Sequence, residues 1–151
     1  MNIKKFVAPA AAVAVALGIA APAWAVNNIK PFGQQETLKD GWGNSEIGYT
    51  VDGLAPSVDA VPAQINGRLY EATVTAESLQ GSVLPIVWDF NARAQNGDNY
   101  RVLANVSTLP GGMLQQGDKT TGKLYFDVVG AEPNSVVYND GTQDVMAWFA
   151  P

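Results

Sequence analysis

The most constraining feature of this sequence is the spacing of its apolar residues, which recur at every second position in short runs. The clearest run alternates with polar residues and ends at Gly81-Ser82; its apolar members are Tyr70, Ala72, Val74 and Ala76. Successive side chains of a strand point to opposite faces, so this period of two predicts a β-strand with one buried face. Beyond residue 26, no stretch keeps apolar residues at helical spacing for three turns. The chain is therefore predicted to be nearly all β.

The same alternation predicts six further strands, at residues 47–51, 86–93, 100–106, 124–128, 135–138 and 145–149. Asp52-Gly53 is expected to end the first of them. Asn96-Gly97-Asp98 is expected to form a hairpin turn, because Asn and Gly tolerate positive φ. Seven to eight short strands at this spacing favour an all-β fold, an immunoglobulin-like antiparallel β-sandwich, over a barrel or an α/β fold. Trp88 is expected in its core.

The first 25 residues have the three parts of a secretory signal peptide. Lys4 and Lys5 form a basic start, residues 6–21 are uncharged and rich in Ala and Val, and small residues flank Trp24. We predict cleavage between Ala25 and Val26, which leaves a β-sandwich domain over residues 26–151 of a secreted, extracellular protein. An uncleaved membrane anchor is the alternative, because residues 6–29 carry no charge.

The sequence contains neither cysteine nor histidine. Disulfides, Cys nucleophiles and His general bases are therefore excluded, as are the His and Cys ligands that zinc and copper sites ordinarily use. Any catalysis would have to rest on carboxylates, Lys, Tyr or Ser, and we predict no cofactor.

The charge balance is acidic. Removal of Lys4 and Lys5 with the leader leaves seven Lys and Arg against 14 Asp and Glu, a net charge of −7. Nucleic acids and anionic membrane surfaces are bound by clustered basic residues, so neither is a predicted partner of the cleaved protein. The surplus carboxylates are those expected of a soluble extracellular surface.

Three groups of side chains were weighed as functional sites. Asp140 and Asp144, with Asn134 and Asn139, place four oxygen-bearing side chains of the kind that binds calcium close together in sequence. Asn-Asp-Gly is also the ordinary composition of a turn. Glu71 and Asp127 could act as the acid and base of a glycoside hydrolase, or could be ordinary outward-facing strand residues.

Trp42 is the third candidate, because it stands between Gly41 and Gly43. A chain segment between two glycines can leave the indole exposed. An exposed indole could anchor a partner protein or stack on a sugar ring. The alternative is that Trp42 folds over one end of the sandwich. Trp42 is the predicted partner-contact residue.

Several blocks of the sequence resemble a known family. The blocks are residues 69–73 (Leu-Tyr-Glu-Ala-Thr), 81–83 (Gly-Ser-Val), 90–93 (Phe-Asn-Ala-Arg), 99–103 (Asn-Tyr-Arg-Val-Leu) and 121–128 (Thr-Gly-Lys-Leu-Tyr-Phe-Asp-Val). They are similar to the small secreted immunogenic antigens of mycobacteria, the MPT/MPB sixty-three family. The resemblance implies a secreted immunoglobulin-like sandwich that the host immune system recognises, whose biochemical role is unsettled, and it carries over no catalytic residues.

These observations favour a secreted, immunogenic, non-enzymatic binding module whose partner is a host or envelope macromolecule. The alternatives are a carboxylate-dependent hydrolase of envelope polysaccharide and a passive exported antigen. The identity of the partner and the oligomeric state do not follow from the sequence.

Overall fold

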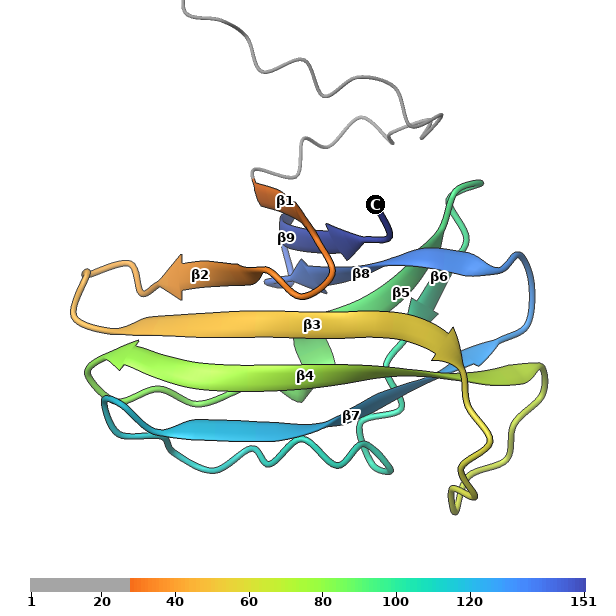
Figure 1. Ribbon diagram of the computed structural model, residues 1–151, viewed down its shortest axis with the longest axis horizontal. Coiled ribbons are helices and arrows are strands. Elements are labelled where there is room, and N and C mark those ends of the chain that lie inside the picture. Colours follow the sequence, from red (N-terminus) through yellow and green to blue (C-terminus); the bar gives the residue numbers. More distant parts are fainter. Residues whose placement is uncertain (1–27) are drawn as a thin grey trace, which may run out of the picture.

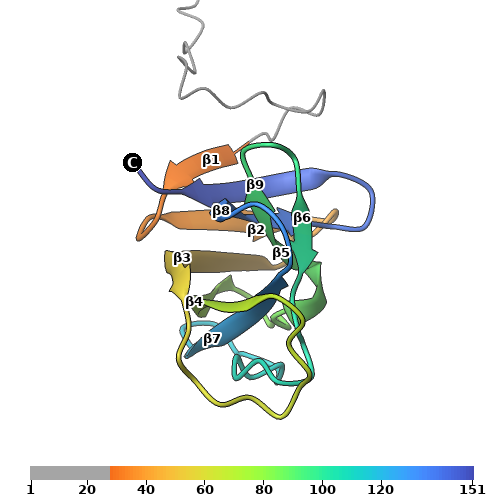
Figure 2. The same cartoon turned by 90° about the vertical axis from the view of Figure 1, so that its right-hand side faces the viewer.

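The computed structural model describes residues 28–151, which fold into two facing β-sheets (Figures 1 and 2). Sheet A has five strands in the order β1 (Asn28–Pro31), β9 (Asp144–Phe149), β8 (Pro133–Asn139), β5 (Phe90–Ala94) and β6 (Asn99–Arg101). Sheet B has four strands in the order β2 (Gln35–Lys39), β3 (Glu46–Pro56), β4 (Arg68–Gln80) and β7 (Lys119–Val128). Neighbouring strands are antiparallel, except that β1 pairs in parallel with β9. The predicted immunoglobulin-like β-sandwich is confirmed in this two-sheet form.

The core lies between the sheets and is built from the apolar members of the alternating runs. Each sheet contributes fully buried side chains; those of sheet B include Tyr49, Val51, Val74, Leu124 and Phe126, and those of sheet A include Phe90, Val136, Met146 and Trp148. The ring of Phe90 packs edge-on against Tyr138 and Tyr49, with ring centroids 5.0 and 5.2 Å apart. Such pairs add to the free energy gained from burying the rings.

The expectation that Trp88 lies in the core is wrong. Residues Val87–Asp89 form one turn of 3-10 helix, and 69% of the Trp88 surface is exposed. A 3-10 helix has about three residues per turn, so it interrupts the period of two, and the buried face of this strand begins only at Phe90. The tryptophan of the core is Trp148, from the last strand.

Several predicted strand limits also differ from the structure. The strand predicted at residues 124–128 already begins at Lys119, as β7. β3 continues through Asp52-Gly53 to Pro56, because Gly53 has a φ of 66° and the register shifts there, as in a β-bulge. β6 ends at Arg101, after which Val102 forms an isolated bridge to Phe126 of sheet B. The hairpin at residues 96–98 is confirmed, with a φ of 95° at Gly97.

Strands β1 and β2 were not predicted, so the described residues contain nine strands instead of seven to eight. Both are short, and only one of their nine residues is buried, which leaves little alternation to detect. Within residues 28–151, no helix is long and apolar enough to cross a membrane.

Candidate functional site

Trp42 lies at the tip of the turn that joins β2 to β3, and 88% of its surface is exposed. Asp40 holds this turn together. Its Oδ1 accepts hydrogen bonds from the backbone N–H groups of Trp42 (3.1 Å) and Asn44 (2.8 Å), and its Oδ2 accepts one from Ser45 Oγ (2.9 Å). These bonds, that from Ser45 first, lower the pKa of Asp40. The turn thus holds the indole out in water, and Trp42 does not fold over the end of the sandwich.

A cavity of about 220 Å³, lined by both apolar and polar side chains, opens at the same end of the sandwich, between this turn and residues 82–86. Leu38, Ile47 and Val83 line it, and Leu84 and Ile86 stand at its edge with 50% and 40% of their surfaces exposed. The hydroxyl of Tyr49 accepts a hydrogen bond from the backbone N–H of Ile86 (3.1 Å). We call Trp42, Leu84, Ile86 and this cavity the open end. Sequence alternation predicted Ile86 in the core, so only Trp42 of this surface was found from the sequence.

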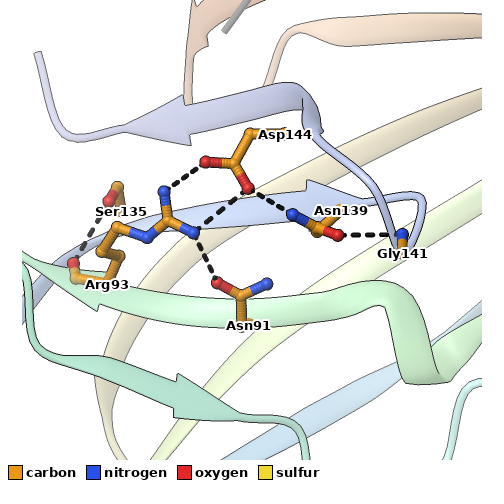
Figure 3. A network of polar contacts seen from close by, with 6 residues as sticks. All are labelled: Asn91, Arg93, Ser135, Asn139, Gly141 and Asp144. Carbon is orange, nitrogen blue, oxygen red and sulfur yellow. Dashed lines mark hydrogen bonds and ion pairs between the residues drawn. The ribbon is translucent and has the colours of Figure 1, made fainter. Parts of the chain in front are cut away.

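The side chains weighed as calcium ligands form hydrogen bonds within the fold, and Figure 3 shows Asp144 and Asn139 in one network. Asp144 is buried and forms a two-armed ion pair with Arg93, and its Oδ1 also accepts a hydrogen bond from Asn139 Nδ2 (2.8 Å). Burial alone would raise the pKa of Asp144, but the hydrogen bonds from Arg93 and Asn139 and the charge of Arg93 hold that pKa below its ordinary value. Asp144 therefore fastens β9 to β5.

Asp140 has a local role. Its Oδ1 accepts hydrogen bonds from the backbone N–H of Thr142 (2.9 Å), the Thr142 hydroxyl (2.7 Å) and the backbone N–H of Gln143 (3.0 Å). Asn139 Oδ1 accepts the N–H of Gly141, which has a φ of 95°. These are the bonds of a tight turn. Among residues 28–151, no three acidic, His or Cys side chains gather as a metal site would require.

The carboxylates considered for hydrolysis both lie on the outer face of sheet B, each with its own partners. Asp127 accepts hydrogen bonds from the backbone N–H groups of Asn66 and Gly67, both at 2.9 Å. Glu71 binds the Ser57 hydroxyl and the ammonium group of Lys123, the latter at 3.0 Å. The structure thus gives both carboxylates a part in fastening the loop of residues 57–66.

Asp59 is the third carboxylate of this network, and alternation did not single it out. Its Oδ2 accepts hydrogen bonds from Lys123 Nζ (2.6 Å) and the Tyr125 hydroxyl (2.7 Å). These bonds, that from Lys123 first, lower the pKa of Asp59, while burial and the bond to Asp59 raise the pKa of Tyr125 to about 12. Neither pKa shift brings the group closer to neutral pH, which is where a general acid or base works best. The predicted cleavage site at Ala25 and Val26 lies outside the described residues.

The fold and these sites define a small β-sandwich whose carboxylates serve mainly to hold its loops, with an exposed tryptophan at one end. Comparison with known proteins gives its family. Residues 27–148 match the family described as a domain of unknown function, DUF1942. The chain is 39% identical to Immunogenic protein MPT63 of Mycobacterium tuberculosis and to Immunogenic protein MPB63 of Mycobacterium bovis, over 97% of this chain and 95% of each relative. It belongs to this family of mycobacterial immunogenic proteins.

Solved structures agree with this assignment. The crystal structure of MPT63, a secreted protein from Mycobacterium tuberculosis, superposes with a TM-score of 0.76 at 38% identity, covering 83% of this chain and 99% of that one. The yjhA protein from Bacillus subtilis is more distant, with a TM-score of 0.50 at 25% identity, covering 76% of this chain and 83% of that one. The resemblance stated from the sequence blocks is confirmed.

Proposed function

We propose that this protein is a secreted immunogenic antigen that works as a non-enzymatic binding module, contacting a protein of the host or of the bacterial envelope through its open end. The observation that carries the proposal is the exposure of Trp42 on a turn that Asp40 has already ordered. An ordered aromatic side chain loses little conformational freedom on binding, and such residues are typical anchors of protein interfaces. The names of the relatives support the antigen assignment.

The form of the open end supports a protein as the partner. Leu84 and Ile86 expose apolar surface beside a cavity that a single apolar side chain of a partner could enter. Residues 28–151 carry 14 acidic and seven basic side chains, so a partner with a neutral or basic rim is favoured over an acidic one.

The non-enzymatic assignment is supported by the state of the carboxylates. Glu71 and Asp59 share Lys123 as a counter-ion, and Asp127 binds two backbone N–H groups. A glycoside hydrolase needs two carboxyl groups that both face the scissile glycosidic bond, whereas these carboxylates face their partners in the fold. A glycan panel tests this: hydrolysis that Glu71→Gln or Asp127→Asn abolishes would contradict the assignment.

A cross-linking pull-down tests the binding role. The exported protein is used as bait against host-cell surface and mycobacterial envelope fractions, with Trp42→Ala and heat-unfolded protein as controls. The proposal expects a saturable partner that only the folded wild-type bait captures and that Trp42→Ala loses. Equal capture by all three baits would favour a passive antigen.

A further inference from the structure

A second surface, distant in sequence from Trp42, has the features of a small-ligand site. It is a groove of about 450 Å³ on the outer face of sheet A, a volume within the range of about 300–1,000 Å³ that is typical of such sites. Its floor consists of two cross-strand pairs, Asn91 with Arg101 and Arg93 with Asn99, whose side chains point away from the core. Trp88 and Asp89 of the 3-10 turn also line it.

The floor of this groove is held in one arrangement before any ligand binds. Arg93 is fixed by its ion pair with Asp144, and its Nη2 also donates a hydrogen bond to Asn91 Oδ1 (3.3 Å), as Figure 3 shows. The Ser135 hydroxyl donates to the backbone carbonyl of Arg93 (3.1 Å). A preorganised floor reduces the entropy lost when a ligand binds.

Two hydrogen-bond donors of the floor have no partner within the described residues. The Arg101 side chain forms no hydrogen bond, ion pair or aromatic contact with any part of residues 28–151, whereas the Arg68 guanidinium lies over the Tyr70 ring and the other basic side chains of this range form ion pairs. The Asn91 side-chain nitrogen donates no hydrogen bond within the same range, although its residue is 7% exposed. Both groups are hydrogen-bond donors available to a ligand.

Trp88 adds an apolar surface to these donors. Its indole is 69% exposed at the groove, so the fold does not need it for core packing. Aromatic rings that lie beside hydrogen-bonding groups suit a ligand with one apolar and one polar face.

The charges of the groove select among ligands of that kind. Arg93 is neutralised by Asp144, so the remaining charges are those of Arg101 and of Asp89, whose carboxylate also accepts a hydrogen bond from the Tyr138 hydroxyl. An anionic ligand would be attracted by Arg101 but repelled by Asp89, and a cationic one the reverse, so a net charge on the ligand gains little here, whereas sugar hydroxyls can donate to the carboxylate and accept from the guanidinium group. We propose that this groove binds an uncharged oligosaccharide, with one pyranose ring stacked on Trp88 and its hydroxyl groups bound by Arg101 and Asn91.

Titration of the exported protein with cellohexaose, mannohexaose and xylohexaose tests the proposal, with oligogalacturonate as the acidic and chitosan hexamer as the cationic comparison. Calorimetry gives the affinity, and the NMR signal of the Trp88 indole N–H gives the location. We expect saturable binding of a neutral hexamer that shifts this signal. Trp88→Ala should abolish binding and Arg101→Ala should weaken it by about tenfold or more, as expected when a hydrogen bond to a charged group is lost.

Trp42→Ala is the matched control, because it removes another exposed indole from a different surface and should leave the affinity unchanged. Melting curves confirm that each variant is folded. Three results would overturn the proposal: no neutral hexamer binds at millimolar concentration, only the charged oligosaccharides bind, or Trp88→Ala retains full affinity. Because the pull-down on Trp42 uses a different surface, its outcome does not decide this one.

Discussion

At one end of the sandwich a short turn holds Trp42 out in water, whereas at the other end a longer loop, residues 57–66, is tied to the sheet (Figure 1). The turn leads into the start of β3, and the loop follows the end of the same strand. The turn is braced mainly within itself, by Asp40, and receives one hydrogen bond from the sheet, from Gln80 Nε2 to the Gly43 carbonyl (3.2 Å). The loop is bound to β4 and β7 by hydrogen bonds and ion pairs of Asp59, Glu71 and Asp127. The carboxylates considered for catalysis therefore fasten one end of the sandwich, and the exposed apolar side chains proposed to bind a partner lie at the other.

The largest effect should come from the core that both ends share. Trp148→Ala is expected to lower the free energy of unfolding by about 3–5 kcal/mol, because it leaves a cavity and removes the indole bond to the Gln34 carbonyl (2.9 Å). Trp88→Ala, the matched exposed control, should change stability by about 0.5 kcal/mol or less. Urea denaturation measures both. Equal losses would mean that the assignment of buried and exposed tryptophans is wrong.

The second largest loss of stability is expected at Asp144. Asp144→Ala leaves Arg93 half-buried without its partner, which should cost about 3 kcal/mol at pH 7. The pKa of Asp144 is lowered in the folded protein, so its contribution is present above the unfolded pKa of about 3.9 and is lost as the pH falls through the folded pKa. Denaturation curves at pH 7 and pH 2 should therefore differ less for the variant than for wild type. An unchanged pH dependence would contradict the ion pair's role.

The fastened loop can be released selectively. Asp127→Ala removes the acceptor of two backbone N–H groups and is expected to cost about 1–2 kcal/mol. Limited proteolysis should then cleave within residues 57–66. The mirror variant, Asp40→Ala, should expose residues 40–45 to proteolysis and leave the loop protected. If both variants are cleaved at the same place, the two ends are not independent.

The smallest effect on stability belongs to the most exposed residue. Trp42→Ala should change the free energy of unfolding by about 0.5 kcal/mol or less, because the indole has almost no packing partners. A thermal melt checks this. A loss above about 2 kcal/mol would instead indicate that Trp42 packs against the sandwich in solution.

The long alternating strands were predictable because one face of each is buried and the other is not. β4 carries this pattern along most of its 13 residues, whereas β7 carries apolar inward-facing residues only in its second half, Leu124–Val128. The pattern failed where the local backbone departs from the period of two, at the 3-10 turn before Phe90 and at the bulge after Asp52. It also failed for β1, which lies at the edge of sheet A and has four exposed residues.

The candidate surfaces were less predictable than the strands. Trp42 could be predicted as an exposed residue because the glycines that indicate exposure, Gly41 and Gly43, are adjacent to it in the sequence. Arg93 and Asp144 pair across 51 residues, and Asp59 reaches Lys123 across 64, so no local spacing reveals them. The assignment of Trp88 failed because only the tertiary structure shows that Trp148 already fills the core.

The most direct test of the open end uses a photo-cross-linking amino acid in place of Trp42, with the same substitution at Val58 as control. Val58 is fully exposed on the fastened loop, so both probes are equally accessible. Illumination with host-cell surface and envelope fractions should give a saturable cross-linked species from position 42 and none from position 58. The same products from both positions, or none from either, would contradict the claim that the open end is the binding surface.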